Sequence, residues 1–338
     1  MSLYLAELRR LGKRRLTRFV LVLLILGLGA IVVAMTASSQ KSGPAAKAKA
    51  EVAAEADYQE QMGYHRQFVA RCEAAKEAGT SQQQGMPTDC AEITPPQREW
   101  FSVEHYLPFE LDFRELFPIF IAVFAGILAL AAYLVAASFV GAEWSSGGMT
   151  NLLLWRPKRL TVLLTKLGAV LTGVLATGLL LGALWTVAFW LIGRYDGTLG
   201  GMTPGVWRSF ALDGARGLGL VLAVTTVGFG LASLGRHTAM ALGAAVAVGV
   251  ISEAGLRIAT SVIGVPFPGR WILSSYALAW FNKKWTLIDV QSCAFDPVNG
   301  CVPKEFTITW QHSAIVFAAG TALVLLATLW TMRRRDVA

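Results

Sequence analysis

The sequence predicts an all-α membrane protein with six transmembrane helices. Of its 338 residues, 54% are hydrophobic and 15% are charged, and the mean hydropathy is +0.51. Soluble domains contain about 25% charged residues. Six apolar runs are long enough to cross a hydrocarbon core of about 30 Å, which requires about 20 helical residues. These runs cover 19–36, 117–140, 167–192, 214–234, 238–260 and 312–331.

The distribution of charge predicts the topology. Residues 1–18 hold six Lys or Arg and one Glu, whereas residues 37–116 hold eight basic and thirteen acidic residues. Short segments rich in Lys and Arg stay in the cytoplasm. We therefore expect a multi-pass protein of the cell membrane with both termini cytoplasmic, cytoplasmic segments at 1–18, 141–166, 235–237 and 332–338, and external segments at 37–116, 193–213 and 261–311. The net charge of +8 follows from this topology and does not indicate nucleic acid binding, which needs the basic residues on one solvated face.

The N-terminal segment 1–18 is patterned as an amphipathic helix. Leucines alternate with five basic residues that could contact lipid or a soluble partner, namely Arg9, Arg10, Lys13, Arg14 and Arg15. The rival interpretation of the first apolar run is a cleavable signal peptide, because small residues follow it at 37–39. The run is long for the apolar region of a signal peptide.

The first external segment is predicted to be helical over 44–79, continuing outward from the first span, and a loop over 80–98. All four cysteines fall in external segments, where disulfides persist. Of the three possible connectivities, we favour the two local pairs, Cys72 with Cys90 and Cys293 with Cys301. A zinc site is less favoured because the spacings fit no usual ligand pattern, and no metal is expected.

The segment that follows the second span carries the most specific pattern. A polar, glycine-broken elbow precedes a short apolar turn, which Pro157 should end because proline disfavours helical geometry in the residue before it. A basic cluster then leads into the third span. Such a segment can present a compact helix to a soluble partner. The residues of interest are Glu143, Trp144, Gly147, Gly148, Leu153, Leu154, Arg156, Pro157, Lys158, Arg159 and Lys166.

This segment resembles the loop between the second and third spans of type-2 ABC exporter permeases. In that family the loop carries a Glu, a Gly-rich elbow, a Leu pair, a Pro, an Arg and a Lys, here matched by Glu143, Gly147 with Gly148, Leu153 with Leu154, Pro157, Arg159 and Lys166. The sequence departs from the pattern at Gly148, where a Thr is expected, and at Arg159, which lies one residue closer to Pro157 than usual. The resemblance implies a coupling helix that docks on an ATPase subunit.

The resemblance also implies the partners. We expect two separate ATPase subunits, which bind ATP and Mg²⁺, a second identical or homologous permease subunit, membrane lipid, and an amphipathic or lipid-like substrate. No G-x-x-x-x-G-K-[ST] phosphate-binding motif occurs in this chain, so it is not predicted to be an enzyme or to hold a cofactor. An alternative is a non-transporting sensor or mechanical transmitter. An ion-coupled transporter would need paired half-sequence repeats, which are not evident.

Two features near the fifth span add further hypotheses. Glu253 and Arg257 lie four residues apart, so that they share a helical face and can form an ion pair. They either neutralise each other or line a substrate path. The residues after this span are too polar for another full span. By resemblance they would form short half-membrane helices over about 262–290. An interfacial loop is the alternative.

Overall fold

The computed structural model describes residues 3–79, 87, 89–155, 158–296 and 300–334, and the side chains of 290–301 are not among the described ones. The chain divides into two compact units. We call the first, residues 1–32, 114–189 and 200–338, the bundle unit, and the second, residues 33–113 and 190–199, the α3 unit. Each is described by itself.

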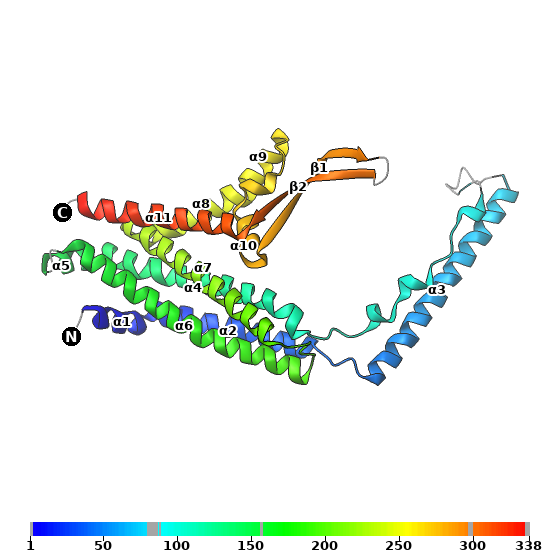
Figure 1. Cartoon of the computed structure of the whole chain (residues 1–338), viewed down its shortest axis with the longest axis horizontal. Coiled ribbons are helices and arrows are strands. Elements are labelled where there is room, and N and C mark those ends of the chain that lie inside the picture. Colours follow the sequence, from blue (N-terminus) through cyan, green and yellow to red (C-terminus); the bar gives the residue numbers. More distant parts are fainter. Residues whose placement is uncertain (1–2, 80–86, 88, 156–157, 297–299, 335–338) are drawn as a thin grey trace. The chain divides into compact units, whose positions relative to one another are not determined.

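Six helices among the described residues are long and apolar enough to cross a membrane, which agrees with a multi-pass membrane protein. They are α2 (Arg15–Ser38), α4 (Phe113–Ser145), α6 (Arg159–Tyr195), α7 (Pro204–Leu234), the helical run Thr238–Ile263, and α11 (Trp310–Arg334). In the bundle unit, the short helices α1 (Leu3–Lys13) and α5 (Gly148–Trp155) and the end of α11 lie at one end (Figure 1).

Several helices extend beyond the predicted spans. The predicted loop over 141–166 is mostly helical, because α4 continues to Ser145 and α6 begins at Arg159. Helix α7 begins at Pro204, where the side chain of Thr203 accepts a hydrogen bond from the Val206 amide at 3.4 Å. Threonine is a favoured N-cap residue and proline is favoured at the first helical position. These signals place residues 204–213 inside a helix, although the sequence analysis assigned them to an external loop.

The fifth spanning run is not a uniform α-helix. It consists of α8 (Thr238–Gly249), the π-helical turn η4 (Val250–Gly255) and α9 (Leu256–Ile263). Single π-helical turns are rare and occur often at functional sites. The run ends at Gly264, whose φ of +70° is a backbone conformation that glycine adopts without strain.

The region between the fifth and sixth spans differs from the prediction of half-membrane helices over about 262–290. After the short turn η5 (Pro268–Trp271) and α10 (Leu273–Asn282), it forms an antiparallel hairpin of β1 (Lys284–Asp296) and β2 (Gly300–Thr309). The prediction of an entirely helical fold is therefore wrong for 284–309, whereas α10 is a short helix within the predicted range 262–290. Its strands are rich in aromatic and β-branched residues, which favour extended structure. Trp285 pairs with Ile308, and the facing Thr286 and Thr307 hydroxyls are 3.3 Å apart.

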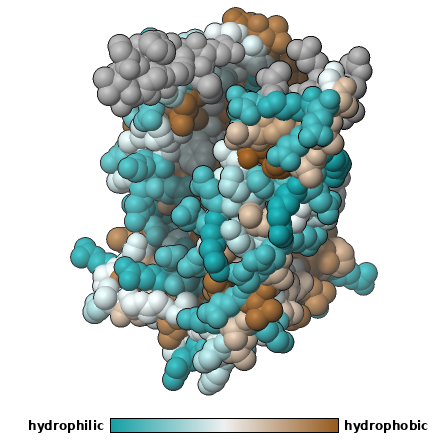
Figure 2. All heavy atoms as spheres, turned by 90° about the vertical axis from the view of Figure 1, so that its right-hand side faces the viewer, coloured by the Kyte–Doolittle hydropathy of each residue, from teal (hydrophilic) through white to brown (hydrophobic). Residues whose placement is uncertain are grey.

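The α3 unit is built around α3 (Pro44–Glu77), a polar helix that does not qualify as a candidate span. The α3 helix lies at the right of Figure 1, and the face seen from that side in Figure 2 is largely hydrophilic. The sequence analysis predicted that this helix continues outward from the first span. Instead, α2 ends at Ser38 and a separate helix, α3, begins at Pro44. The break is held by Ser39, whose hydroxyl donates to the Asp196 carbonyl at 2.7 Å and accepts from the Leu111 amide at 3.0 Å.

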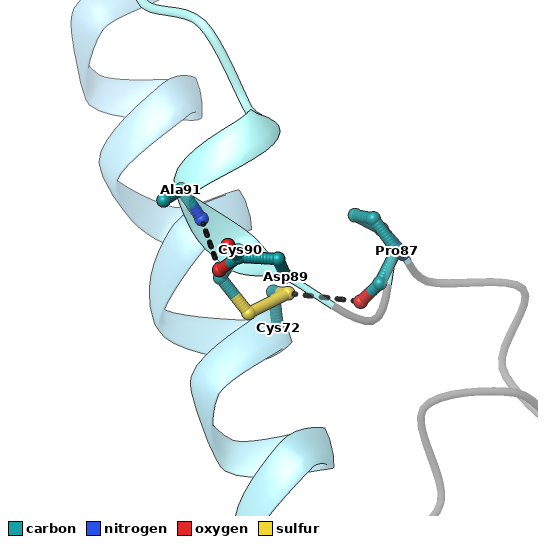
Figure 3. Close-up of a disulfide and its surroundings, with 5 residues drawn as sticks. All are labelled: Cys72, Pro87, Asp89, Cys90 and Ala91. Atoms are coloured by element: carbon teal, nitrogen blue, oxygen red, sulfur yellow. Dashed lines mark hydrogen bonds between the residues drawn. A yellow bond between two sulfur atoms is a disulfide. The ribbon is translucent and has the colours of Figure 1, made fainter.

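A disulfide closes the α3 unit. Cys72 of α3 and Cys90 of the 3₁₀ turn η1 (Cys90–Glu92) are bonded, with their Cα atoms 5.9 Å apart, which confirms the predicted pair (Figure 3). The Cys72 sulfur lies 3.8 Å from the Pro87 carbonyl oxygen, and the Asp89 side chain caps the turn by accepting from the Ala91 amide at 3.1 Å. The predicted pair Cys293–Cys301 lies outside the described side chains.

The returning chain packs along α3 through two further turns, η2 (Arg98–Phe101) and η3 (Val103–Tyr106). Arg98 pairs with Glu55 of α3 and lies over the Tyr58 ring. The Tyr106 hydroxyl donates to the Asp57 carboxylate at 2.5 Å, and this hydrogen bond raises the pKa of the phenol. Polar contacts thus hold this segment on a helix that offers a small apolar surface.

Candidate functional site

A cluster of buried charges joins three helices at the end of the bundle unit that carries α5. Lys166 of α6 is fully buried, and its ammonium lies 2.6 Å from Glu143 of α4 and 2.8 Å from Glu7 of α1. The side chains of Glu7 and Glu143 are 4% and 8% exposed. Because both carboxylates face one ammonium, Lys166 is the centre of the cluster.

Two arginines complete the cluster on the Glu143 side. The guanidinium groups of Arg10 and Arg14 lie 3.4 and 3.2 Å from the same Glu143 oxygen. Arg14 also donates to the Ser138 carbonyl at 3.0 Å and lies over the Phe139 ring, 4.8 Å from its centroid. Burial lowers the pKa of the Arg14 guanidinium, and the Glu143 charge opposes this shift. We call Glu7, Arg10, Arg14, Glu143 and Lys166 the charge cluster.

The charge cluster joins α1, α4 and α6 through buried ion pairs. Breaking a buried ion pair by removing one partner costs about 3–5 kcal/mol, because the remaining charge stays buried without compensation. Separating the three helices at this end would therefore be costly as long as the separated charges stay out of water. The Tyr4 hydroxyl of α1 also donates to the Thr172 hydroxyl of α6 at 2.7 Å, so α1 is tied to α6 both by the charge cluster and by this hydrogen bond.

Helix α5 follows the cluster directly. Gly147, with a φ of +71°, makes the elbow between α4 and α5 that the sequence indicated. Met149 and Leu153 of α5 are 0% and 7% exposed, whereas Leu154 and Trp155 are 80% and 84% exposed. One side of this short helix is thus anchored in the bundle unit, and its last turn presents a leucine and a tryptophan on the surface.

A cleft of about 500 Å³ separates α5 from α1. Arg10, Arg14 and Glu143 of the charge cluster line it on one side, and Asn151, Leu152 and Trp155 of α5 on the other. The cleft opens next to the exposed end of α5. It is therefore part of the same surface.

The remaining predicted coupling residues lie around this surface. Trp144 is 9% exposed, with the Arg236 guanidinium 5.0 Å above its ring, and Gly148 is the first residue of α5. Lys158 is exposed and Arg159 begins α6. Arg156 and Pro157 lie outside the described residues.

The predicted lipid or partner contacts of the N-terminal segment divide into two groups. Arg10 and Arg14 point into the charge cluster, as described above. Arg9, Lys13 and Arg15 have exposed side chains. The sequence analysis did not single out Glu7, although its position three residues before Arg10 places both on one helical face. A single acid among six basic residues was the signal that could have identified it.

Glu253 and Arg257 come together as their spacing indicated, with 3.8 Å between their charged groups. Glu253, however, also caps α10. Its carboxylate accepts hydrogen bonds from the Ser274 amide at 3.0 Å and the Ser274 hydroxyl at 2.8 Å, while the neighbouring Ser252 hydroxyl accepts from the Leu273 amide at 2.8 Å. The π-helical turn η4 therefore holds the N-terminus of α10.

The opposite end of α10 is held by a polar cluster on α7 that the sequence analysis missed. Asp213 and Arg216 form an ion pair at 3.3 Å, and the Trp280 indole donates to the Arg216 carbonyl at 3.1 Å. The Lys283 ammonium lies 3.4 Å from the Ser209 hydroxyl. These residues were not identified because the assignment of 193–213 to a loop separated Asp213 from the helix it belongs to.

The described residues contain no group of three or more His, Cys, Asp or Glu side chains that could hold a metal ion. No protein-family model, curated protein or solved structure matches the chain.

Proposed function

We propose that the chain is the permease subunit of an ATP-driven exporter of the ABC type, and that its ATPase is a separate protein. The observation that carries the proposal is the charge cluster beside α5. It joins α1, α4 and α6 at the point where α5 presents Leu154 and Trp155 to the surface. Exposed aromatic residues rimmed by charge are typical of protein interfaces.

In the proposed mechanism, α5 is the coupling helix. Closure of two ATP-bound ATPase subunits pushes on α5, and the charge cluster makes α1, α4 and α6 follow as one body. A second permease subunit, identical or homologous, completes the pathway. The substrate class, amphipathic or lipid-like, comes from the resemblance alone, and ATP and Mg²⁺ are bound by the partner.

Copurification from mild detergent tests the proposal. We expect a stoichiometric partner with a phosphate-binding loop, and reconstituted vesicles of the complex should move substrate only with ATP. The double variant Leu154→Ala/Trp155→Ala should weaken recovery of the ATPase by about tenfold or more, because tryptophan truncation at an interface often costs about 2 kcal/mol. Leu130→Ala is the control, since Leu130 is 69% exposed on the spanning helix α4.

Recovery of the native chain without an ATP-binding partner, or unchanged recovery in the α5 variant, would overturn the proposal. A non-transporting sensor or mechanical transmitter is the second candidate. The α3 unit favours it, because a 34-residue polar helix braced by a disulfide is a rigid body suited to ligand or partner binding. Ligand binding without ATP-dependent flux in the same vesicles would support this candidate.

A further inference from the structure

A groove of about 390 Å³ runs between α6 and α7, with α4 as its floor. Its lining is aromatic and buried at Phe117 and Phe124 of the α4 floor, at Trp185 of α6 and at Phe210 of α7. Leu179 and Trp207, which are 56% and 42% exposed, border its opening. All lining residues belong to the bundle unit.

Small residues on α7 create the space. A Cβ atom added at Gly214 would meet no atom within 4 Å, so the groove is open at this position. At Gly178 on α6, by contrast, an added Cβ would lie 2.8 Å from Leu218 and 3.0 Å from Leu128. The groove therefore lies next to a close contact of α6 with α4 and α7.

The polar side chains on the α6 wall of the groove already have hydrogen-bond partners. The Trp185 indole donates to the Phe120 carbonyl at 3.2 Å, and the Thr186 hydroxyl donates to the Gly182 carbonyl at 2.8 Å. Both side chains direct their donors into the backbone of the bundle. A ligand on this floor is therefore recognised by its apolar surface and shape.

The length of the groove selects an elongated ligand. On α7 it extends from Trp207 to Val221, which at 1.5 Å per residue is about 21 Å. Half of a hydrocarbon core of about 30 Å is about 15 Å. The groove is therefore long enough to hold a chain that extends through one leaflet.

We propose that this groove binds one acyl chain of a phospholipid from the leaflet that surrounds the start of α7. The floor supplies aromatic contacts, Gly214 leaves room for the chain, and the headgroup stays at the surface near Trp207. This site is independent of any ATPase, so its test can fail without affecting the proposed function, and the reverse also holds.

Photolabelling tests the site on the full-length protein in phosphatidylcholine vesicles that contain a phosphatidylcholine with a diazirine on one acyl chain. We expect labelled peptides from the groove side of α6 and α7 to exceed those from the lipid-exposed positions Val246 and Leu326. Gly214→Leu should lower groove labelling by about tenfold, because the new side chain displaces about two methylene groups.

Gly219→Leu is the matched control, since an added Cβ at Gly219 also meets no atom within 4 Å but the residue does not line the groove. It should label like the native chain. Ala183→Leu on the other wall provides a second blocking variant if Gly214→Leu does not fold. Equal labelling of the groove and of other exposed helix faces would overturn the proposal, as would unchanged groove labelling in folded Gly214→Leu and Ala183→Leu.

Discussion

The ammonium group of Lys166 lies 2.6 Å from a carboxylate oxygen of Glu143, and both side chains are buried. These two residues stand at the ends of the segment that contains α5. Their contact closes the segment at its base, so that α5 projects from a fixed point. The arrangement anchors the segment that carries α5 to α4 and α6, which is consistent with the coupling role proposed above.

Replacing Lys166 by methionine should destabilise the bundle unit by about 3–5 kcal/mol, because it removes the positive charge that neutralises two buried carboxylates. Glu143 keeps Arg10 and Arg14, whereas Glu7 keeps only a distant contact of 3.9 Å with Arg10. Thermal unfolding in detergent, followed by tryptophan fluorescence, measures the effect.

The double variant Lys166→Met/Glu7→Gln should recover at least part of this loss, since the glutamine carries no uncompensated charge. Lys158→Met is the control because Lys158 is exposed in the same segment, and its change should be within about 0.5 kcal/mol. If Lys166→Met and Lys158→Met unfold at the same temperature, the charge cluster does not stabilise the bundle.

The sequence predicted the spans well because each is a long apolar run, a signal that depends on composition and not on tertiary contacts. It also placed Glu143 and Lys166 in one patterned segment, and the two side chains lie 2.6 Å apart. It did not reveal Glu7 as their partner, because a contact between residues so distant in sequence depends on how α1 packs. The hairpin was missed for a related reason. Its strands, of 13 and 10 residues, are rich in β-branched and aromatic residues, but whether two such segments pair depends on tertiary contacts and not on composition.

Glu253→Leu should release the first turn of α10. The leucine cannot accept hydrogen bonds from the Ser274 amide and hydroxyl, and loss of a cap costs about 0.5–2 kcal/mol. Glu253→Gln retains a carbonyl oxygen that can accept one of them, so its effect should be smaller. Hydrogen exchange of the Leu273 and Ser274 amides, followed by mass spectrometry, should accelerate in the order native, Gln, Leu.

The variant Arg257→Met distinguishes the contribution of the ion pair from that of the cap, because it removes the pair and leaves the Glu253 carboxylate in place. The charged groups of the pair are 3.8 Å apart, whereas Glu253 accepts hydrogen bonds from Ser274 at 2.8 and 3.0 Å, so the cap and not the pair makes the close contacts to α10. Exchange at α10 should therefore stay near the native rate. Faster exchange in Arg257→Met than in Glu253→Leu would show that the ion pair, and not the cap, holds α10. Unchanged transport in Glu253→Gln at native abundance would exclude a role in the substrate path.

The disulfide yields a prediction for the α3 unit alone. Replacing Cys72 and Cys90 by serine should destabilise this unit by about 3 kcal/mol, the chain-entropy value for a closed loop of about 15 residues. Limited proteolysis should then cut the chain between α3 and η1 faster, while the spanning helices stay resistant. Peptide mapping without reductant should recover the two cysteines in one linked fragment from native protein. Four free thiols in native protein would contradict the disulfide and the external location of these segments.

The sidedness of the α4–α5 elbow can be measured by labelling with a membrane-impermeant maleimide. We expect Ser145→Cys, which is exposed beside the elbow, to react only after the cells are opened, because the basic segment around it should stay in the cytoplasm. Val52→Cys, 71% exposed on α3, should react in intact cells, and the unsubstituted chain gives the background from its own cysteines. Labelling of Ser145→Cys from outside would remove α5 from the reach of a cytoplasmic ATPase, since an elbow on the outer face cannot receive force from ATP hydrolysis inside the cell.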